Sequence, residues 1–212
     1  MPIYRLIEDL IFPPVDEAED GIVAIGGDLS PERLILAYHS GIFPWFNEDE
    51  PIVWWSPDPR FVLFPDSVKV SRTMKRILKK GEFNVTFNRN FEEVISCCKK
   101  AERKGQTGTW ITDEMREAYI NLHELGFAKS VEVWKENELV GGMYGVDLGH
   151  VFCGESMFSK VSNASKVGLV TFMRKFQEEG GRLLDCQVHS DHMVSMGAGE
   201  ISRNDFLGFL DS

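Results

Sequence analysis

The 212-residue chain has no apolar run approaching the roughly 20 residues that a membrane-spanning helix needs. Glu8 and Asp9 interrupt the apolar residues near the N-terminus and no basic segment precedes them, so we expect no secretory signal. The four cysteines form no CxxC pair, and Cys97 and Cys98 are adjacent, so a disulfide framework is not expected. These absences favour a reducing compartment, and we predict a cytoplasmic protein that does not associate with membranes.

Several motifs that bind cofactors or mark nucleophiles are also missing. The chain contains neither GxGxxG nor GxxxxGK[ST], and Phe158 stands where the second glycine of a GxSxG motif would fall. Cys186, His189 and His192 form a CxxHxxH, but no second Cys/His pair stands at a useful spacing to complete a zinc site. We therefore favour a structural or exposed role for these three residues and expect neither a metal nor a cofactor.

Positive charge is scarce: 23 Lys and Arg residues face 33 Asp and Glu residues, which gives a net charge of −10. This balance argues against a protein coated in nucleic acid. One segment is basic although the whole chain is acidic: the pattern of residues 71–80 predicts a helix with one apolar face and one basic face. A solvated surface and a site for a specific polyanion both remain open. The basic residues at the helical spacing are Arg72, Lys75, Arg76, Lys79 and Lys80.

The segment 129–191 carries the clearest structural pattern. Glu136-Asn137 is a turn signal between two strand-like stretches, and Gly180-Gly181 ends a helix that begins near Asn163. The order strand, strand, strand, helix, strand follows, with strands at 129–135, 138–147, 150–158 and 182–188. We predict an α+β fold whose larger domain holds a mixed sheet.

The N-terminal part shows a different composition. Residues 1–20 suggest a loosely packed arm, 21–27 a strand, and Ser30-Pro31 the start of a helix that Gly41 ends. An aromatic and proline-rich segment follows, and we place a boundary near Pro65, between a small domain at 1–65 and a larger domain at 66–212. A strand at 83–87 and helices that begin after Asn90, Thr112 and Ser202 complete the expected elements, and we expect these three residues and Ser30 to act as N-caps.

Two carboxylates, Glu155 and Asp185, fall within strand patterns where a core residue is expected. A buried carboxylate costs several kcal/mol unless it is paired or used in chemistry. A structural ion pair with Lys166 or Arg182 is one explanation, but we favour a functional site.

Trp45 and Trp110 lie in loops rich in proline or glycine, where a purely structural role is less secure than for a core tryptophan. Stacking on a nucleic-acid base is a plausible role for either ring.

Several motifs together resemble the leucyl/phenylalanyl-tRNA–protein transferase family. They are GGDLSPERLILAYHSGIFPWF, WWSPDPR, SRTMKR, GTWIT, HELG, ELVGGMYGV, FCGESMFS, NASK and DCQV…DH, and they cover nearly the whole chain in the family's order. The resemblance implies a GNAT-like acyltransferase domain after a small N-terminal domain. It also implies transfer of Leu, Phe or Met from aminoacyl-tRNA to proteins with an N-terminal Lys or Arg, which marks them for N-degron proteolysis.

The same resemblance assigns residues to roles. Asp185 and Gln187 would activate the acceptor amine, and Glu155 would serve the acceptor site. Because an aminoacyl ester is already activated, this transfer needs no ATP and no metal. The remaining assignments are Met143, Phe152 and Phe172 around the donor side chain, Trp45 and Trp110 beside the terminal adenosine, Tyr119 in the substrate site, and the basic residues of 72–80 on the tRNA.

Two rival functions stay open. An acyl-CoA-dependent N-acetyltransferase shares this fold, but it needs a Q/R-x-x-G-x-G/A-like turn where this chain has SNASKVG. A non-catalytic RNA-binding adaptor could use the basic helix and the loop tryptophans. The expected partners of a transferase are aminoacyl-tRNA and the acceptor protein, with the enzyme itself a monomer.

Overall fold

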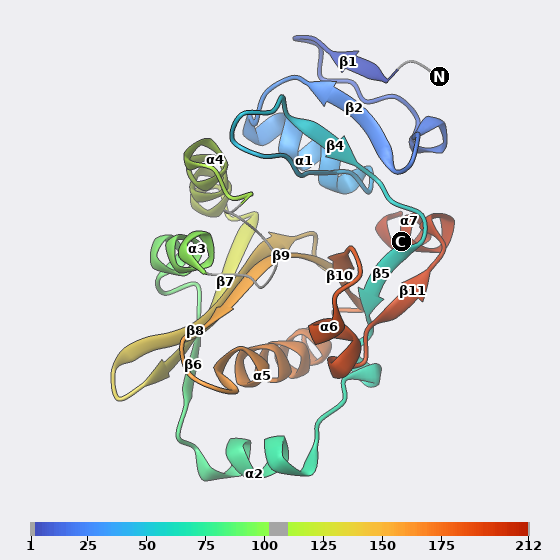
Figure 1. Ribbon diagram of the computed structural model, residues 1–212. Helices are drawn as coiled ribbons and strands as arrows, with labels where there is room; N and C mark the ends of the chain where they lie inside the picture. The colour runs from blue at the N-terminus through green and yellow to red at the C-terminus, as the bar shows by residue number, and fades with distance from the viewer. Residues whose placement is uncertain (1–2, 102–109, 212) are drawn as a thin grey trace.

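The computed structural model describes residues 3–101 and 110–211 (Figure 1). Within those ranges the strands form one sheet of four, in the order β1-β2-β4-β3, and one of seven, in the order β11-β5-β10-β9-β8-β7-β6. The predicted α+β architecture, with a small N-terminal sheet and a larger mixed sheet, is confirmed.

The small sheet is built from the first quarter of the chain. Residues 1–20, expected to be an arm, contribute β1, which pairs in parallel with β2. Its neighbours β2, β4 and β3 pair antiparallel. The elements here are β1 (Tyr4–Leu6), η1 (Val15–Glu17), β2 (Ile22–Gly26), α1 (Pro31–His39), β3 (Phe43–Pro44) and β4 (Val53–Trp55).

The large sheet contains the predicted hairpin and its continuation. Glu136 and Asn137 have φ of 51° and 68°, as the two central residues of a type I′ turn require. β10 pairs in parallel with β9, while β8 pairs antiparallel with both β7 and β9. The strands are β5 (Arg60–Leu63), β6 (Asn84–Phe87), β7 (Ala128–Lys135), β8 (Glu138–Asp147), β9 (Val151–Ser159), β10 (Leu183–Gln187) and β11 (Gly199–Ile201).

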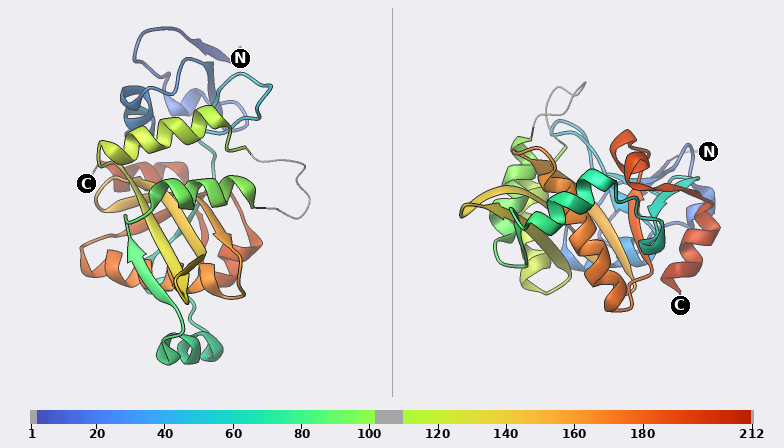
Figure 2. Two further views of the ribbon diagram at one scale, coloured as in Figure 1. Left: turned by 90° about the vertical axis from the view of Figure 1, so that its left-hand side faces the viewer. Right: turned by 90° about the horizontal axis from the view of Figure 1, so that it is seen from below.

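Helices cover both faces of this sheet. Figure 2 shows α3 and α4 side by side on one face, with α5 behind the sheet, and α3 and α5 both contact β8. The apolar residues of α3 and α4 join one core cluster, and those of α5 join another. The helices are α2 (Arg72–Lys80), α3 (Phe91–Lys100), α4 (Asp113–Glu124), α5 (Ala164–Glu178), α6 (Asp191–Met196) and α7 (Arg203–Leu210), and η2 covers Pro65–Ser67.

Of the four predicted caps, those at Thr112 and Ser202 form as expected, and Ser71 adds one that was not predicted. Ser30 precedes α1 but makes no side-chain cap bond. The hydroxyls of Ser71, Thr112 and Ser202 each accept a hydrogen bond from the backbone N–H three residues on. Asn90 precedes α3 but makes no cap bond to the backbone; its amide donates instead to the Glu93 carboxylate.

The order of the large sheet places β5 between β10 and β11. β5 lies before the boundary expected near Pro65, yet it belongs to the larger sheet; the division into domains at that point stays a prediction. α6 and β11 were not expected, because segments of six and three residues are too short for a hydrophobic period to emerge.

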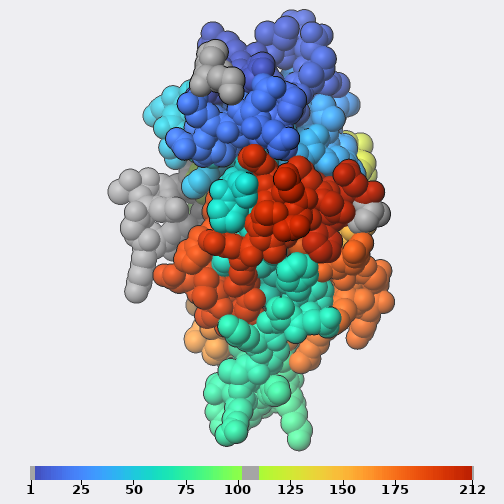
Figure 3. Space-filling view, turned by 90° about the vertical axis from the view of Figure 1, so that its right-hand side faces the viewer, coloured from blue at the N-terminus to red at the C-terminus, as the bar shows by residue number. Residues whose placement is uncertain are grey.

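The two sheets share one of the core clusters. It joins Tyr38 and Trp54 of the small sheet's layer to Phe91, Tyr119 and Phe206. In the space-filling view, the C-terminal residues lie against both the N-terminal residues and the segment that follows β4 (Figure 3). Across residues 3–101 and 110–211, no helix is long and apolar enough to cross a membrane.

Candidate active site

A pocket of about 440 Å³ opens where the small sheet meets β9 and β10. Its polar wall contains Glu155, Asp185 and Gln187, the three residues assigned to acceptor chemistry from the sequence. The structure therefore brings together one residue from β9 and two from β10. These two strands are parallel neighbours with Asp185 opposite Cys153, so Gln187 and Glu155, each two residues further along, lie side by side.

Asp185 is completely buried, and its partner is Arg60 on β5. Arg60 Nε donates to Oδ1 at 2.9 Å and Nη2 donates to Oδ2 at 2.7 Å, a two-pronged pairing. The alternative considered from the sequence, an ion pair with Lys166 or Arg182, therefore named the wrong cation. Since β5 is the antiparallel neighbour of β10, it presents Arg60 to Asp185 from 125 residues away.

Glu155 is 8% exposed and is held by three donors. The Tyr38 hydroxyl donates to Oε1 at 2.7 Å, the Gln187 amide donates to Oε1 at 2.7 Å, and the Tyr119 hydroxyl donates to Oε2 at 3.0 Å. The two tyrosine hydroxyl oxygens also lie within hydrogen-bonding distance of each other, and since each hydroxyl has one proton, either can donate to the other in place of its bond to Glu155. These hydrogen bonds fix the orientation of the Glu155 carboxyl group at the pocket.

Burial raises the pKa of Glu155 from 4.5 to about 7, although the three hydrogen bonds pull it down. The folded protein therefore binds this proton more tightly than the unfolded chain does. By linkage, the group favours folding fully below about pH 4.5, and this contribution is lost as the pH rises towards about 7. Near neutral pH, Glu155 exists in both protonation states.

Gln187 has a φ of 63°, in the left-handed region that few residues other than glycine adopt. The register between β10 and β5 shifts between Asp185 and Gln187, which marks a bulge. The Gln187 N–H donates to Asp185 Oδ1 at 2.8 Å, and its side-chain amide reaches Glu155. The bulge thus turns Gln187 out of the strand and links the two carboxylates.

Trp45 and Trp110 both line the pocket, as does Phe43 from β3. Trp45 is 37% exposed, and its ring centroid lies 5.7 Å from that of Trp55, whose indole N–H donates to the Trp45 carbonyl. These three rings form an aromatic wall beside the polar wall. The predicted stacking on the terminal adenosine fits this position and stays a prediction.

The three residues assigned to the donor side chain divide into two groups. Met143 lines the pocket, together with Met157, Leu184 and Met193. Phe152 and Phe172 are 1% and 8% exposed and lie in the core cluster that also contains Met143, with ring centroids 4.6 Å apart. They are not among the residues that line the pocket; as placed, they lie behind its apolar wall.

The basic helix α2 forms as predicted and packs against α5, at the end of the protein opposite the small sheet (Figure 1). Met74 is buried, Ile77 and Leu78 are half-buried, and the basic residues face solvent. Lys80 pairs with Glu82. The exposed cations include Arg72, Lys75, Arg76, Lys79 and Lys80.

Cys186 and His192 line the pocket, while His189 packs against Phe61 with ring centroids 5.2 Å apart. Burial is the main cause that lowers the pKa of His192, and Lys166 adds to it. Within the described ranges, no group of three or more His, Cys, Asp and Glu side chains is arranged to hold a metal ion.

Sequence reasoning missed Arg60 and Tyr38. It also assigned Tyr119 to the substrate site, but Tyr119 is fully buried, does not line the pocket and reaches the site only through its bond to Glu155. Tyr38 follows the apolar period of α1, so nothing local separates it from a core tyrosine. Arg60 did leave a signal. It opens an otherwise apolar strand, RFVL, in which all four residues are buried, and such an arginine needs a buried acid.

The fold has a counterpart among solved structures. The crystal structure of FemX has a TM-score of 0.50 to this chain, at 11% sequence identity, covering 85% of this chain and 71% of that one. The likeness concerns the fold alone. Together with the β-β-β-α-β order and the pocket beside β9 and β10, it defines the class of fold, an α+β fold like that of FemX.

Sequence comparison identifies the family. The family model described as leucyl/phenylalanyl-tRNA protein transferase matches residues 62–211, and the model of its N-terminal domain matches residues 27–58. The transferase of Flavobacterium johnsoniae is 60% identical over 211 residues, 99% of this chain and 100% of that protein. That of Syntrophobacter fumaroxidans is 56% identical, over 99% of this chain and 90% of that protein. The chain belongs to the leucyl/phenylalanyl-tRNA–protein transferase family, as its motifs predicted.

Proposed function

We propose that this protein transfers Leu or Phe, and also Met, from aminoacyl-tRNA to the N-terminal Lys or Arg of acceptor proteins. The tag marks the acceptor for N-degron proteolysis in the cytoplasm, and the enzyme works as a monomer. The observation that carries the proposal is the pocket in which a buried, hydrogen-bonded carboxylate faces an aromatic wall. The family membership supports the donor and acceptor classes.

In this reaction the acceptor's α-amino nitrogen attacks the ester carbonyl carbon of the aminoacyl-tRNA. A carbon–nitrogen bond forms, the bond to the ribose oxygen breaks, and the amine's proton leaves while the terminal hydroxyl gains one. An α-amine has an ordinary pKa of about 7.7–8.0, so a useful minority is neutral at pH 7. The enzyme's main task is therefore to hold the amine in line with the ester.

The polar wall suits that task. Gln187 donates to Glu155 through Nε2, so its Oε1 is the amide atom that can accept a hydrogen from the amine. Glu155 supplies negative charge for a cationic first residue. Asp185 is enclosed by Arg60 and the Gln187 N–H, which suits orientation of Gln187 more than direct contact with the amine. Its expected role as proton acceptor stays a prediction.

A transfer assay tests the proposal against its rivals. The purified protein is given labelled Leu-tRNA and an Arg-initiated peptide, with acetyl-CoA as the control donor and an Asp-initiated peptide as the control acceptor. We expect label only in the Arg-initiated peptide and only from the tRNA donor. A methylene-sized difference in an apolar pocket is worth about 1–3 kcal/mol, so Ile-tRNA, branched at Cβ, should be used less well than Leu-tRNA. Acetylation of the peptide, or tRNA binding without transfer, would favour a rival.

Replacing Glu155 with glutamine should weaken Arg- and Lys-initiated acceptors. Loss of a charged hydrogen bond costs about 1.5–3 kcal/mol, so kcat/KM for these peptides should fall roughly 10- to 150-fold, with donor affinity unchanged. Wild-type activity should also rise with pH through about 7, as Glu155 ionises. The glutamine variant should lose this dependence, which the ratio of the two pH profiles measures because the amine titrates equally in both.

Glu132 provides a matched control for this variant. It is also fully buried in the large sheet and accepts hydrogen bonds from Thr86 and Ser130, but it lies outside the pocket lining. Glu132→Gln should affect stability without changing acceptor preference. A Glu155→Gln variant that lost tRNA affinity instead would place Glu155 in the donor site.

A further inference from the structure

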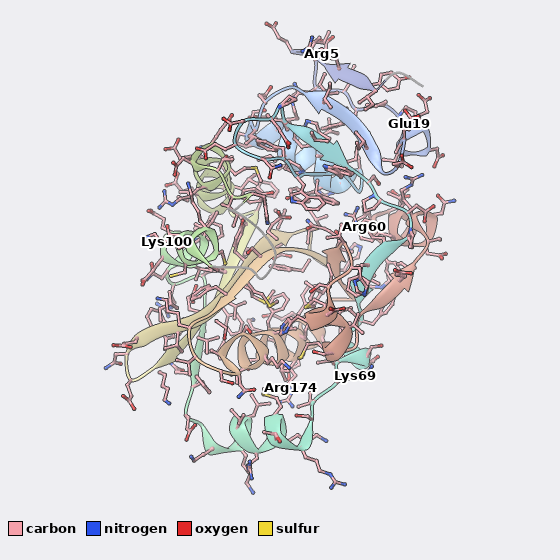
Figure 4. All side chains as sticks on the ribbon, viewed as in Figure 1. Arg5, Glu19, Arg60, Lys69, Lys100 and Arg174 are labelled. Carbon is pink, nitrogen blue, oxygen red and sulfur yellow. The ribbon has the colours of Figure 1, made fainter. Side chains whose placement is uncertain are left out.

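The Arg60 side chain joins segments that are far apart in the sequence. Its guanidinium is 1% exposed and pairs with Asp185 through two nitrogens, while Nη1 donates to the Gly41 carbonyl at 3.0 Å. The guanidinium carbon lies 4.8 Å from the ring centroid of Phe43 and 4.4 Å from that of Phe206. Figure 4 shows Arg60 on β5, where the small sheet meets the large one.

These contacts reach both walls of the pocket. On one side, Asp185 Oδ1 accepts from Arg60 Nε and also from the Gln187 N–H, so the cation and the bulge share one carboxylate oxygen. On the other side, Phe43 itself lines the pocket, two residues before Trp45. Movement of the guanidinium would therefore displace residues of both the polar wall and the aromatic wall.

Stability alone is a weak explanation for this arrangement. A buried ion pair often contributes no more to stability than well-packed apolar residues of the same volume. The left-handed backbone of Gln187 is unfavourable for a residue other than glycine, so neighbouring contacts must hold it in that conformation. Strain of this kind is found where a site needs a side chain aimed in one direction.

We propose that Arg60 is a positioning residue for the transfer reaction. Through Asp185 it fixes the bulge that brings the Gln187 amide to Glu155. Through Gly41 and Phe43 it fixes the position of the polar wall relative to the aromatic wall. The inference rests on the proposed function, because it takes Gln187 and Glu155 to be the groups that meet the acceptor. Arg60 touches neither substrate itself. Its planar fork is required, since a lysine ammonium cannot bond both carboxylate oxygens and the carbonyl in the same plane.

Arg33 offers a matched control, because it is also a fully buried arginine. It pairs with Asp28 and donates to the carbonyls of Ile7 and Asp9, so it holds the N-terminal segment. None of these residues lines the pocket described above. Arg33→Lys should therefore reproduce the general cost of altering a buried arginine without altering the site.

The experiment compares Arg60→Lys, Arg33→Lys and wild type at a temperature where circular dichroism shows all three to be folded. Misplacement of reacting groups by about 1 Å can cost roughly 100-fold in rate, so we expect kcat of Arg60→Lys to fall about 10- to 100-fold. The KM for the tRNA donor should stay within about twofold. Arg33→Lys should keep the wild-type kcat.

Two further readouts separate positioning from a loss of fold. In a Gln187→Ala background, Arg60→Lys should lower kcat by a smaller factor than it does in the wild type, because the route through the Gln187 amide has been removed and only the route through Gly41 and Phe43 remains. The rise of activity with pH should also move to higher pH in Arg60→Lys, since the Gln187 bond favours ionised Glu155. The other groups facing Glu155, which the substitution leaves in place, are Tyr38, Tyr119, Asp185 and Cys153.

The proposal is overturned if folded Arg60→Lys keeps the wild-type kcat and pH profile, or if Arg33→Lys loses as much kcat. Additive losses in the Gln187→Ala background would also overturn it. These results differ from failure of the proposed function, in which the wild-type protein itself transfers no amino acid; that outcome would remove both proposals.

Discussion

Asp185→Ala is expected to lower the transfer rate at least 100-fold and to destabilise the protein at the same time. The change leaves the Arg60 guanidinium buried without its carboxylate, which costs about 3–5 kcal/mol. For a chain of this size, that corresponds to a fall in Tm of roughly 10 °C or more. The Gln187 N–H also loses its acceptor, so the bulge that aims the Gln187 amide is released. Thermal unfolding and single-turnover transfer, both measured on the same preparation, give the two numbers.

Asp185→Asn separates orientation from proton transfer. Asparagine is close in shape and keeps one oxygen for Arg60 and the Gln187 N–H, but it cannot take up a proton from the amine. Because Asp185 is fully enclosed, we expect Asn to retain distinctly more activity than Ala. If Asp185→Asn and Asp185→Ala are both folded and lose the same amount of activity, the result would favour Asp185 as the proton acceptor. General-base catalysis typically contributes a factor of about 10²–10⁴ to the rate.

Asp28→Ala is the control for both variants. Asp28 also pairs with a buried arginine, Arg33, but its side chain is 53% exposed and lies outside the pocket lining. Its loss should cost less stability and leave kcat unchanged. A similar fall in kcat would mean that the Asp185 effect reports general destabilisation.

The second large effect concerns tRNA binding by α2. Replacing Lys75, Arg76 and Lys79 with alanine should reduce the salt dependence of tRNA affinity by roughly two to three units of slope, because each lost phosphate contact removes about 0.7–0.9. The three side chains are exposed and alanine is the best helix former, so α2 should remain folded. Phosphate contacts carry no base information, which suits an enzyme that takes several tRNAs with the same amino acid. Affinity is measured by filter binding between about 50 and 200 mM salt.

A minimal donor tests where the loss arises. An aminoacyl adenosine has no acceptor stem, so the triple variant should use it as well as wild type does. Arg5→Ala is a matched single control against Lys75→Ala, because Arg5 is equally exposed but lies on β1, at the opposite end of the molecule (Figure 4). An unchanged slope in the triple variant would make α2 an ordinary solvated helix.

Local chemistry in the sequence predicted much of the fold. The hairpin at Glu136-Asn137, the long helix ended by Gly180-Gly181 and the caps at Thr112 and Ser202 depend on residues a few positions apart, and these formed as expected. The family motifs likewise named Glu155, Asp185 and Gln187, which the structure gathers at one pocket. Hydrophobic period and turn chemistry are local properties, so a sequence can express them directly.

The partners of the buried charges were decided only by the tertiary structure. A strand pattern shows that Asp185 is buried, but nearby Arg182 and Lys166 were equally plausible cations. The choice of Arg60 follows from β5 entering the large sheet beside β10, a long-range pairing with no local signature. In the same way Tyr38 and Tyr119, from helices on two different layers, converge on Glu155. The sequence determined which buried polar side chains need a hydrogen-bonding partner. The strand register and the layering of the fold determined which residues are the partners, because those contacts join residues that meet only when the core forms.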